Sequence, residues 1–410
     1  MAVTDVVNAP PGGAPEDGDA CERERRATWF ELFCDLVFVA AVGQVTHRLG
    51  TAPDARSVLA VAALFLPVWW TWVLYADRAN RLDKDNAVDR LLTMTGMAGV
   101  CGIAVFIGQV GKGTSDDIGF VLSYLLARWM VTVLYAWAGR GDPRFKAAAR
   151  SYAACSALSS LLWAGGLALP DGAPRWTAWG AGMLVELALP FLAGRYTAAV
   201  PSDADHLTER FGLFTIIMLG EMVLGFVGGL SHTRTGPAAA LAGVLAFALC
   251  ACLWWAYFNA SSSGPGSHAQ LASRPWLRHA FVYGHLPMQC GLAVLGGTLG
   301  VVVSGQVSQL SPAAAACVGG GIAVFHAVGA LVRAAFTGFG ETVVRIRLAV
   351  TAGVLVMIPL APRMPTTAAL GLLALILAVG VLVEQPAHRR RVADRDGTPV
   401  PQLAEMSPST

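Results

Sequence analysis

Long apolar runs alternate with short polar stretches along almost the whole chain. Runs of about 20 residues recur from Trp29 to Glu384, and a helix of that length crosses the ~30 Å hydrocarbon layer of a bilayer. The pattern predicts an all-α, polytopic transmembrane helical bundle of about twelve helices, with no interior stretch left for a soluble catalytic domain. The predicted spans are 29–49, 57–76, 88–109, 118–139, 148–169, 176–193, 209–230, 237–258, 279–303, 312–336, 342–361 and 366–385.

The same pattern divides the chain into two tails and two halves. Residues 1–22 and 392–410 are polar and lack an apolar core, which is typical of disordered tails. Between them, an internal repeat separates a first six-helix half at 23–194 from a second at 195–391. Six is an even number, so the halves must share one orientation, as in parallel-repeat transporters; chance similarity among apolar helices is the alternative. The aligned residues are Phe30 to Phe33 with Phe211 to Phe214, Trp69 and Trp70 with Trp254 and Trp255, and Arg90 and Gly96 with Arg278 and Gly284.

Basic residues gather on one side of the predicted membrane. Of the 29 Lys and Arg residues, 22 fall on the side of the N-terminus, six fall on the opposite side, and Arg128 lies within a span. Cytoplasmic loops carry the excess of basic residues. We therefore expect a multi-pass protein of the cell membrane with both termini cytoplasmic.

Composition narrows the class of function. Hydrophobic residues make up 55% of the chain and charged residues 14%, against roughly 25% charged residues in soluble domains. The net charge of +2 offers no basic field for nucleic acid. Seven of the eight cysteines lie in apolar runs, which predicts free thiols rather than disulfides or zinc ligands. We expect no metal and no cofactor, with protons as the coupling ion, and a small-molecule or lipid substrate met within the lipid bilayer.

Five stretches of the chain carry distinctive motifs. They are RRATWFELFCDLVFVAAV at 25–42, WWTWVLYADR at 69–78, ERFGLFTIIMLGE at 209–221, WWAYF at 254–258 and YGHLP at 283–287. Together they resemble the bacterial low temperature requirement protein A family over most of residues 23–390. The resemblance implies a multi-pass membrane protein, and the family name reports a cold-growth phenotype rather than a biochemical activity. Two positions depart from the family pattern: Cys34 replaces a usual aromatic residue, and Asn259 stands where an acidic residue often follows an aromatic string.

Ionisable side chains within the spans are the strongest functional signal, because each costs about 2.5 kcal/mol or more near mid-bilayer. Glu31 and Asp35 are four apart on one helix face and could share a proton, an ion or a cationic group; alternatively, Glu31 is a solvated carboxylate at a helix start. Glu221, with no basic residue within one helical turn, is the first choice for a functional carboxyl, and Glu186 lies at similar depth. Arg128 requires a carboxylate or an anionic substrate group as its partner. Polar contacts that only join helices are the alternative for these groups.

Further polar side chains extend this set. His285, in a Gly-His-Leu-Pro run, and His326 lie inside spans and could serve a proton path, although a lone buried imidazole is more often a satisfied core group. Gln44 and His47 could continue a polar lining toward the outer end of the first span. Asp77, in the stretch WWTWVLYADR at 69–78, is a secondary candidate for the substrate or proton pathway.

Tryptophans and a charged loop complete the candidates. Trp70 and Trp255 belong to the repeat-related pairs, for which interfacial belts are the simplest interpretation and an aromatic cage for a cation is the alternative. Asn259 follows the second pair and is not expected to carry protons. Arg78, Arg81, Asp83, Asp85, Asp89 and Arg90 are interpreted as a solvated loop cluster rather than a diphosphate site.

Three functions fit these residues. The favoured hypothesis is a proton-coupled secondary transporter of a small or amphipathic molecule, whose halves rock about one midplane site. The alternative is an intramembrane enzyme of cyclase or isomerase type, with Asp35 or Glu221 as general acid on a lipid or isoprenoid. A membrane stress or sensor protein is the third. The midplane site would be lined by Asp35, Arg128, Glu186, Glu221 and His285.

Overall fold

The computed structural model describes residues 28–50, 53–81, 86–197, 203–231, 236–261, 265–304 and 308–396, so the predicted tail at 1–22 lies outside the described residues. Within them the chain forms α-helices, two short 3-10 helices (η1 and η2) and one isolated β-bridge between Gln309 and Pro365. The helices are α1 (Trp29–Thr46), η1 (His47–Leu49), α2 (Ala55–Arg81), α3 (Ala87–Ile107), α4 (Thr114–Gly141), α5 (Arg144–Leu167), α6 (Ala173–Thr197), α7 (Ala204–Ser231), α8 (Pro237–Ser261), α9 (Pro265–Ser273), α10 (Pro275–Val303), α11 (Pro312–Thr337), α12 (Thr342–Leu360), η2 (Ala361–Arg363) and α13 (Thr366–Asp396).

The predicted all-α transmembrane fold is confirmed. Ten helices in the described residues are long and apolar enough to cross a membrane, namely α1 to α4, α7, α8 and α10 to α13. Helices α5 and α6 have spanning length, at 24 and 25 residues, but are more polar. With them, every predicted span overlaps a helix. The nine-residue α9 was not predicted, because its sequence has no apolar run.

Several helices continue beyond their apolar runs. Helix α2 ends at Arg81, α7 begins at Ala204 and α10 begins at Pro275, each four or five residues outside the predicted span. The polar extensions remain helical because their side chains find partners, as where Arg81 pairs with Asp77. Helix α13 continues to Asp396, so it extends into the predicted tail at 392–410, of which 397–410 lie outside the described residues.

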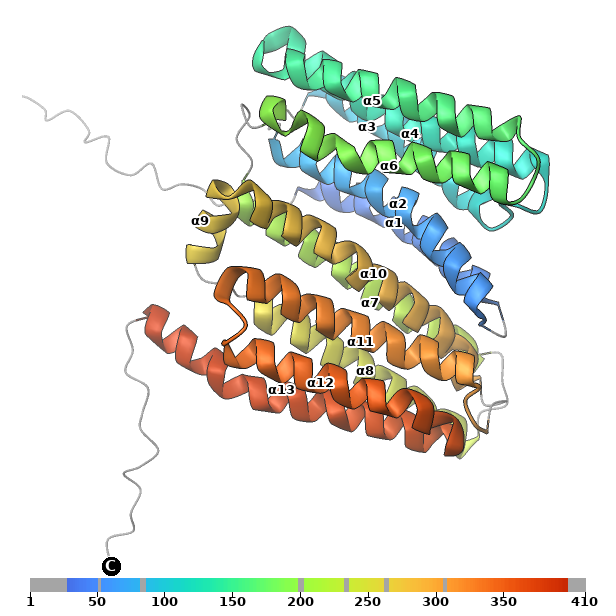
Figure 1. Ribbon diagram of the computed structural model, residues 1–410, viewed down its shortest axis with the longest axis vertical. Helices are drawn as coiled ribbons and strands as arrows, with labels where there is room; N and C mark the ends of the chain where they lie inside the picture. The colour runs from blue at the N-terminus through green and yellow to red at the C-terminus, as the bar shows by residue number, and fades with distance from the viewer. Residues whose placement is uncertain are drawn as a thin grey trace, which may run out of the picture.

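The helices form two groups that meet along a seam (Figure 1). In the first group, α3, α4, α5 and α6 pack in sequence and α1 packs on α3. In the second group, α10, α11, α12 and α13 pack in sequence, α7 packs on α10, and α8 contacts α7 and α13. The seam is formed where α1 and α2 contact α7 and α10. We call the end of the bundle at which α1 begins the near end, and the opposite end the far end.

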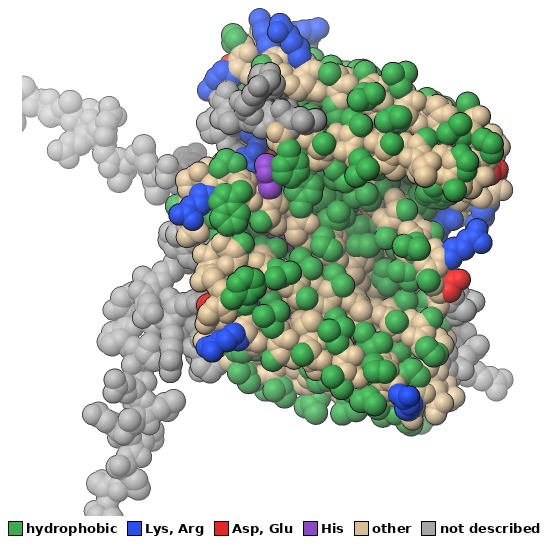
Figure 2. Space-filling view, viewed as in Figure 1, with side chains coloured by type: hydrophobic (Ala, Val, Ile, Leu, Met, Phe, Trp, Pro, Cys, Tyr) green, Lys and Arg blue, Asp and Glu red, His purple; other side chains and the backbone are tan. Residues whose placement is uncertain are grey.

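The outer surface of the bundle is apolar between its two ends. Figure 2 shows hydrophobic side chains over the middle of the visible face and charged side chains toward the ends of the helices. Large hydrophobic residues are strongly exposed on several helices, including Leu59, Val105 and Leu161 at 70% or more. Such a surface is stable against lipid tails rather than water.

Helix α2 lies in the interior, and this changes the interpretation of its tryptophans. Trp69, Trp70 and Trp72 lie near the middle of α2 and are at most 1% exposed. An interfacial belt is therefore wrong for them. Trp254 and Trp255 are 47% and 45% exposed, so the two sets of tryptophans have different environments and do not form one cage.

Glycines bring α7 and α10 into close contact within the second group. A Cβ added at Gly225 would lie 2.8 Å from the carbonyl oxygen of Gly296, and one added at Gly229 would overlap the carbonyl of Gly300. Small residues spaced four apart allow membrane helices to approach at backbone distance. The two backbones therefore touch over this turn, whereas neighbouring Gly228 faces open space.

Candidate functional site

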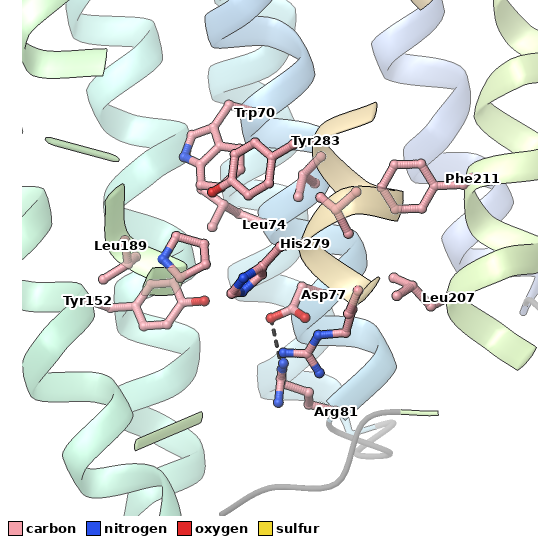
Figure 3. Close-up of a pocket in the computed structure, with 14 residues that line it drawn as sticks. Trp70, Leu74, Asp77, Arg81, Tyr152, Leu189, Leu207, Phe211, His279 and Tyr283 are labelled. Carbon is pink, nitrogen blue, oxygen red and sulfur yellow. Dashed lines mark hydrogen bonds and ion pairs between the residues drawn. The ribbon is translucent and has the colours of Figure 1, made fainter. Parts of the chain in front are cut away.

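A cavity opens in the seam toward the near end of the bundle (Figure 3). Its lining residues come from α2, α5, α6, α7 and α10, and it holds about 620 Å³ of space including its open mouth. Pockets for small molecules often occur between the helices of bundles. The lining residues are Trp70, Val73, Leu74, Asp77, Arg81, Tyr152, Leu189, Pro190, Leu207, Phe211, Arg278, His279, Val282 and Tyr283.

Charged groups occupy the near end of the cavity. Arg81 Nε donates to Asp77 Oδ2 over 2.8 Å, as expected for residues four apart on a helix. Arg278 and His279, from the first turns of α10, line the same end. Two guanidinium groups thus meet one carboxylate, and Tyr152 supplies a phenol beside them.

Aromatic rings form the deeper wall. Trp70 and Tyr283 are stacked with centroids 5.9 Å apart, and Phe191 stacks on the other face of Tyr283 at 5.3 Å. The Tyr283 hydroxyl donates to the carbonyl oxygen of Leu187 over 2.6 Å, which fixes the ring. Figure 3 shows His279 between these rings and the charged end. The cavity is therefore amphipathic, with charge at one end and aromatic rings at the other.

A buried polar network closes the seam beyond the cavity. Trp69 Nε1 donates to Gln289 Oε1 over 2.6 Å, and Gln289 Nε2 donates to Thr215 Oγ1 over 3.2 Å. The three residues come from α2, α10 and α7 and are at most 1% exposed. Pro67 precedes Trp69 by two residues and Pro287 precedes Gln289 by two, so both helices lack a backbone hydrogen bond at this level. We call Trp69, Gln289 and Thr215 the barrier.

The predicted pair Glu31 and Asp35 meets a matching pair on α7. His206 Nε2 lies 3.3 Å from Glu31 Oε2, and Arg210 Nη2 donates to Asp35 Oδ1 over 2.8 Å. Both contacts join residues that are 175 apart in sequence, which requires α1 and α7 to run in the same direction. We call these two contacts the α1–α7 ladder. Trp72 Nε1 also donates to Asp35 Oδ1, over 2.9 Å.

This α1–α7 ladder is adjacent to the cavity but does not line it. Glu31 also closes a capping box with Thr28, so it lies at a helix start as the alternative interpretation expected, although its side chain is only 11% exposed. Asp35 is 3% exposed, and its Oδ2 has no hydrogen-bond partner among the described residues; the same is true of Nε and Nη1 of Arg210. The ladder therefore contains hydrogen-bond donors and an acceptor that have no partner among the described residues in this conformation.

Arg128 pairs with Glu186 inside the first group of helices. The Arg128 Nε to Glu186 Oε2 distance is 2.5 Å, and both side chains are 1% exposed. Tyr124 and Ser159 donate hydroxyl hydrogen bonds to the same carboxylate, over 2.8 and 2.5 Å. Glu186, rather than Glu221, is thus the partner of Arg128, and neither member of the pair lines the cavity.

Glu221 lies beyond the barrier, toward the far end. It is partly buried, and a Cβ added at Gly43 of α1 would lie 2.9 Å from Glu221 Oε2, so the carboxyl packs against the α1 backbone. Among the described residues it has no ion pair or hydrogen bond. Gln44 and His47, the predicted outward continuation, are both exposed near the far end of α1.

The buried histidines have separate environments. His285 Nε2 lies 2.9 Å from the Tyr257 hydroxyl, and Nδ1 lies 2.7 Å from the carbonyl oxygen of Phe281. Both ring nitrogens therefore have partners, as in a satisfied core histidine. His326 is 3% exposed, and neither of its ring nitrogens has a hydrogen-bond partner in the part of the chain described. Asn259 lies near the end of α8, partly buried.

The predicted midplane residues are thus divided among several places rather than gathered in one lining. Asp35 contacts α2 and α7, Glu221 contacts α1, and His285 contacts α8. Of the thirteen candidates, Asp77 and Trp70 line the cavity. The described residues contain no group of three or more His, Cys, Asp or Glu side chains that could hold a metal ion.

Sequence reasoning did not identify the basic residues that line the cavity or those that pair with Glu31 and Asp35. Arg81 and Arg278 were treated as loop residues because the predicted spans end with the apolar runs. His206 and Arg210 were missed for the same reason, although their spacing of four repeats that of Glu31 and Asp35 and could have revealed the match. The solvated-loop interpretation is wrong for Arg78 and Asp89, which form a buried ion pair, and residues 82–85 lie outside the described residues.

Fold and surface together define a multi-pass α-helical membrane protein with an amphipathic cavity between two groups of helices. The family model described as bacterial low temperature requirement A protein (LtrA) matches residues 26–382. The chain therefore belongs to the LtrA family, as its motifs indicated. It is also similar to the uncharacterized protein RA0937 of Rhizobium meliloti (strain 1021), with 29% identity over 303 residues that cover 70% of this chain and 71% of that protein.

Proposed function

We propose that this protein is a proton-coupled secondary transporter of the cell membrane, with both termini cytoplasmic. The observation that carries the proposal is the seam cavity, which opens toward one end of the bundle and stops at the barrier formed by Trp69, Gln289 and Thr215. A site that is open to one side and closed to the other is what alternating access requires. In this proposal the near end is the cytoplasmic side, in accord with its excess of basic residues.

The relation between the two groups of helices supports the proposal. Rungs of equal sequence separation show that α1 and α7, the first helix of each half, run in the same direction. Packing follows the same order in each half, from α3 to α6 and from α10 to α13. These features favour two parallel six-helix repeats that could move against each other along the seam.

Two prolines provide the bending points for such a movement. Pro67 lies in the middle of α2 and Pro287 in the middle of α10, each two residues from a barrier residue. Proline removes one backbone hydrogen bond and lowers the cost of a helix bend at that level. Bending at both positions would separate Trp69 from Gln289 and open the seam toward the far end.

Glu221 is the proposed proton carrier. It follows the barrier residue Thr215 by six residues of α7, about 9 Å, whereas Asp77 follows Trp69 by eight residues of α2 in the opposite direction, about 12 Å. The barrier therefore separates Glu221 from the cavity. A partly buried carboxyl with no basic partner is well suited to exchange protons as its surroundings change.

Proton flux in proteoliposomes tests the proposal. The wild-type chain is compared with Glu221→Gln and with Glu209→Gln, which makes the same change on an exposed position of the same helix. A pool of small molecules extracted from the source cells is added on the near side. We expect flux that depends on the extract, is lost in Glu221→Gln and persists in Glu209→Gln.

Other results would refute the transporter. Flux that does not differ between the two variants would remove Glu221 from the pathway. If no flux occurs but a lipid in the extract changes mass, the protein is an enzyme. The general acid would then be sought at Asp77, the sole carboxylate among the described cavity residues, because Asp35 and Glu221 do not line the cavity.

A further inference from the structure

We infer that the seam cavity binds an amphipathic anion, with a carboxylate or phosphate head group at Arg278 and a single apolar chain along Trp70 and Tyr283. This inference rests on the proposed function, since it names the class of cargo, but binding can be measured without transport.

The first step is the charge balance at the near end of the cavity. Asp77 is the one carboxylate among the described lining residues, and Arg81 already holds it over 2.8 Å. Arg278 lies near enough to Asp77 and Arg81 to interact with both electrostatically, yet no carboxylate of the described residues lies within ion-pair distance of it. This guanidinium is partly buried inside an apolar bundle and is a surplus positive charge among the described residues. A single negative charge on a ligand would balance it.

The second step is the geometry of the head-group site. A guanidinium presents a planar fork of donors that matches the two oxygens of a carboxylate or a phosphate. His279 follows Arg278 on the first turns of α10 and contributes a ring nitrogen at the same end. The Tyr152 hydroxyl of α5 also lines this end; it donates to the Tyr135 hydroxyl over 3.5 Å and would turn toward an anion to become one more donor. An anion therefore meets donors from two helices on opposite sides of the seam.

The third step is the wall beyond the head group. Trp70 and Tyr283 stack across the seam, and the remaining apolar lining includes Leu74, Val282 and Phe211. Trp70 precedes Asp77 by seven residues of α2, which is about 10 Å. An extended octyl chain has about this length. A hydrophilic anion such as inorganic phosphate would leave this apolar wall without a partner, so the ligand is expected to be amphipathic.

Equilibrium binding to the full chain in phosphatidylcholine nanodiscs tests the inference. Radiolabelled octanoate and octyl phosphate are the anionic probes, octyltrimethylammonium and octyl glucoside are the cationic and neutral controls, and binding to empty nanodiscs is subtracted. We expect saturable binding of at least one anionic probe and none of the cation. Octanoate and octyl phosphate are separate arms, so the preferred head group follows from their ratio.

Substitutions then locate the site. Arg278→Gln should weaken anion binding roughly tenfold or more, the effect of losing a charged hydrogen bond, and Arg278→Lys should retain most of it. Arg274→Gln, the same charge change one turn earlier on an exposed position, should leave binding unchanged. Asp77→Asn should strengthen binding, because it removes the carboxylate that competes with the anion. A purely structural role for Asp77 would give the opposite sign.

The inference is overturned if octyltrimethylammonium binds as tightly as the anions, if Arg278→Gln and Arg274→Gln behave alike, or if Asp77→Asn weakens binding. The transporter proposal fails separately. If the anion binds but no ligand-dependent proton flux occurs, the anion site is supported and the transporter proposal is refuted. If a cationic or neutral compound drives the flux, the transporter proposal is supported and the anion site is refuted.

Discussion

The close contact between α7 and α10 can be tested with two neighbouring glycines of α7. A Cβ at Gly229 would lie 2.9 Å from the carbonyl carbon of Gly300, in addition to overlapping its oxygen. Ordinary contacts between carbon atoms are about 3.5–4.0 Å, so Gly229→Ala must force the helices apart by at least about 0.6–1.1 Å at this level. The obstacle is backbone, which cannot rotate away. Gly228→Ala, one residue earlier, meets nothing within 4 Å.

Both substitutions replace glycine by alanine inside the same helix. Each therefore stabilises the helix by up to about 1 kcal/mol through helix propensity, and this gain cancels when the stabilities of the two variants are compared. Overpacking at Gly229 should then cost about 1–3 kcal/mol, or more if the α7–α10 contact separates along its length. We expect Gly229→Ala to melt about 1–4 °C below Gly228→Ala, since 1 kcal/mol corresponds to about 2–4 °C in domains of 150–250 residues and to about 1 °C in a chain of this length.

A thiol-reactive dye provides the assay. Cys34, Cys250 and Cys317 are free and buried, so their labelling reports unfolding of detergent-solubilised protein on heating. Equal melting temperatures for the two variants would refute the close approach of α7 and α10, and with it the position of Thr215 and Gln289 in the barrier.

Three further outcomes are expected. Glu186→Gln should lower the free energy of unfolding by about 3 kcal/mol or more, because it leaves the buried Arg128 guanidinium without a counter-charge, and replacing both residues by Met should recover most of the loss. Thiol labelling on heating measures the stability of these variants, and a double variant that is no more stable than Glu186→Gln would contradict the reasoning. Tyr257→Phe removes the hydroxyl partner of His285 and should cost about 1 kcal/mol of stability with proton flux intact, so a loss of flux would move His285 into the proton path. Pro287→Ala restores a backbone donor in the middle of α10 and should slow proton flux without weakening octanoate binding; an unchanged flux rate would exclude bending there.

The parts of the fold that follow from local pattern were predictable. Apolar runs alone located every long helix, because a span must be apolar wherever it meets lipid. Glu31 and Asp35 do share a face, since their spacing of four fixes it. The expectation that Arg128 pairs with a membrane carboxylate is confirmed at Glu186, because an unpaired guanidinium within a span is too costly.

What could not be predicted depends on contacts between distant segments. Arg347 of α12 pairs with Glu384 of α13, over 3.1 Å, and no local pattern joins them. The start of α7 was placed at 209, where its apolar run begins, and this put Arg210 only just inside the helix and left His206 outside. Their helical form depends on acidic partners on α1, which lie 175 residues away in sequence. Helix ends of this kind are stabilised by tertiary pairing rather than by their own composition.

The α1–α7 ladder also has a consequence for the order of assembly. Its acidic side belongs to α1, and its basic side, on α7, is made 175 residues later. At about 5–20 residues per second, Glu31 and Asp35 are in the membrane or at its insertion machinery for roughly 10–35 s before His206 and Arg210 are synthesised. Until then the nascent segment from α1 to α6 lacks the counter-charges of α1. Synthesis of α7 thus completes this earlier segment, and a chain truncated before α7 should be a preferred substrate of membrane quality control.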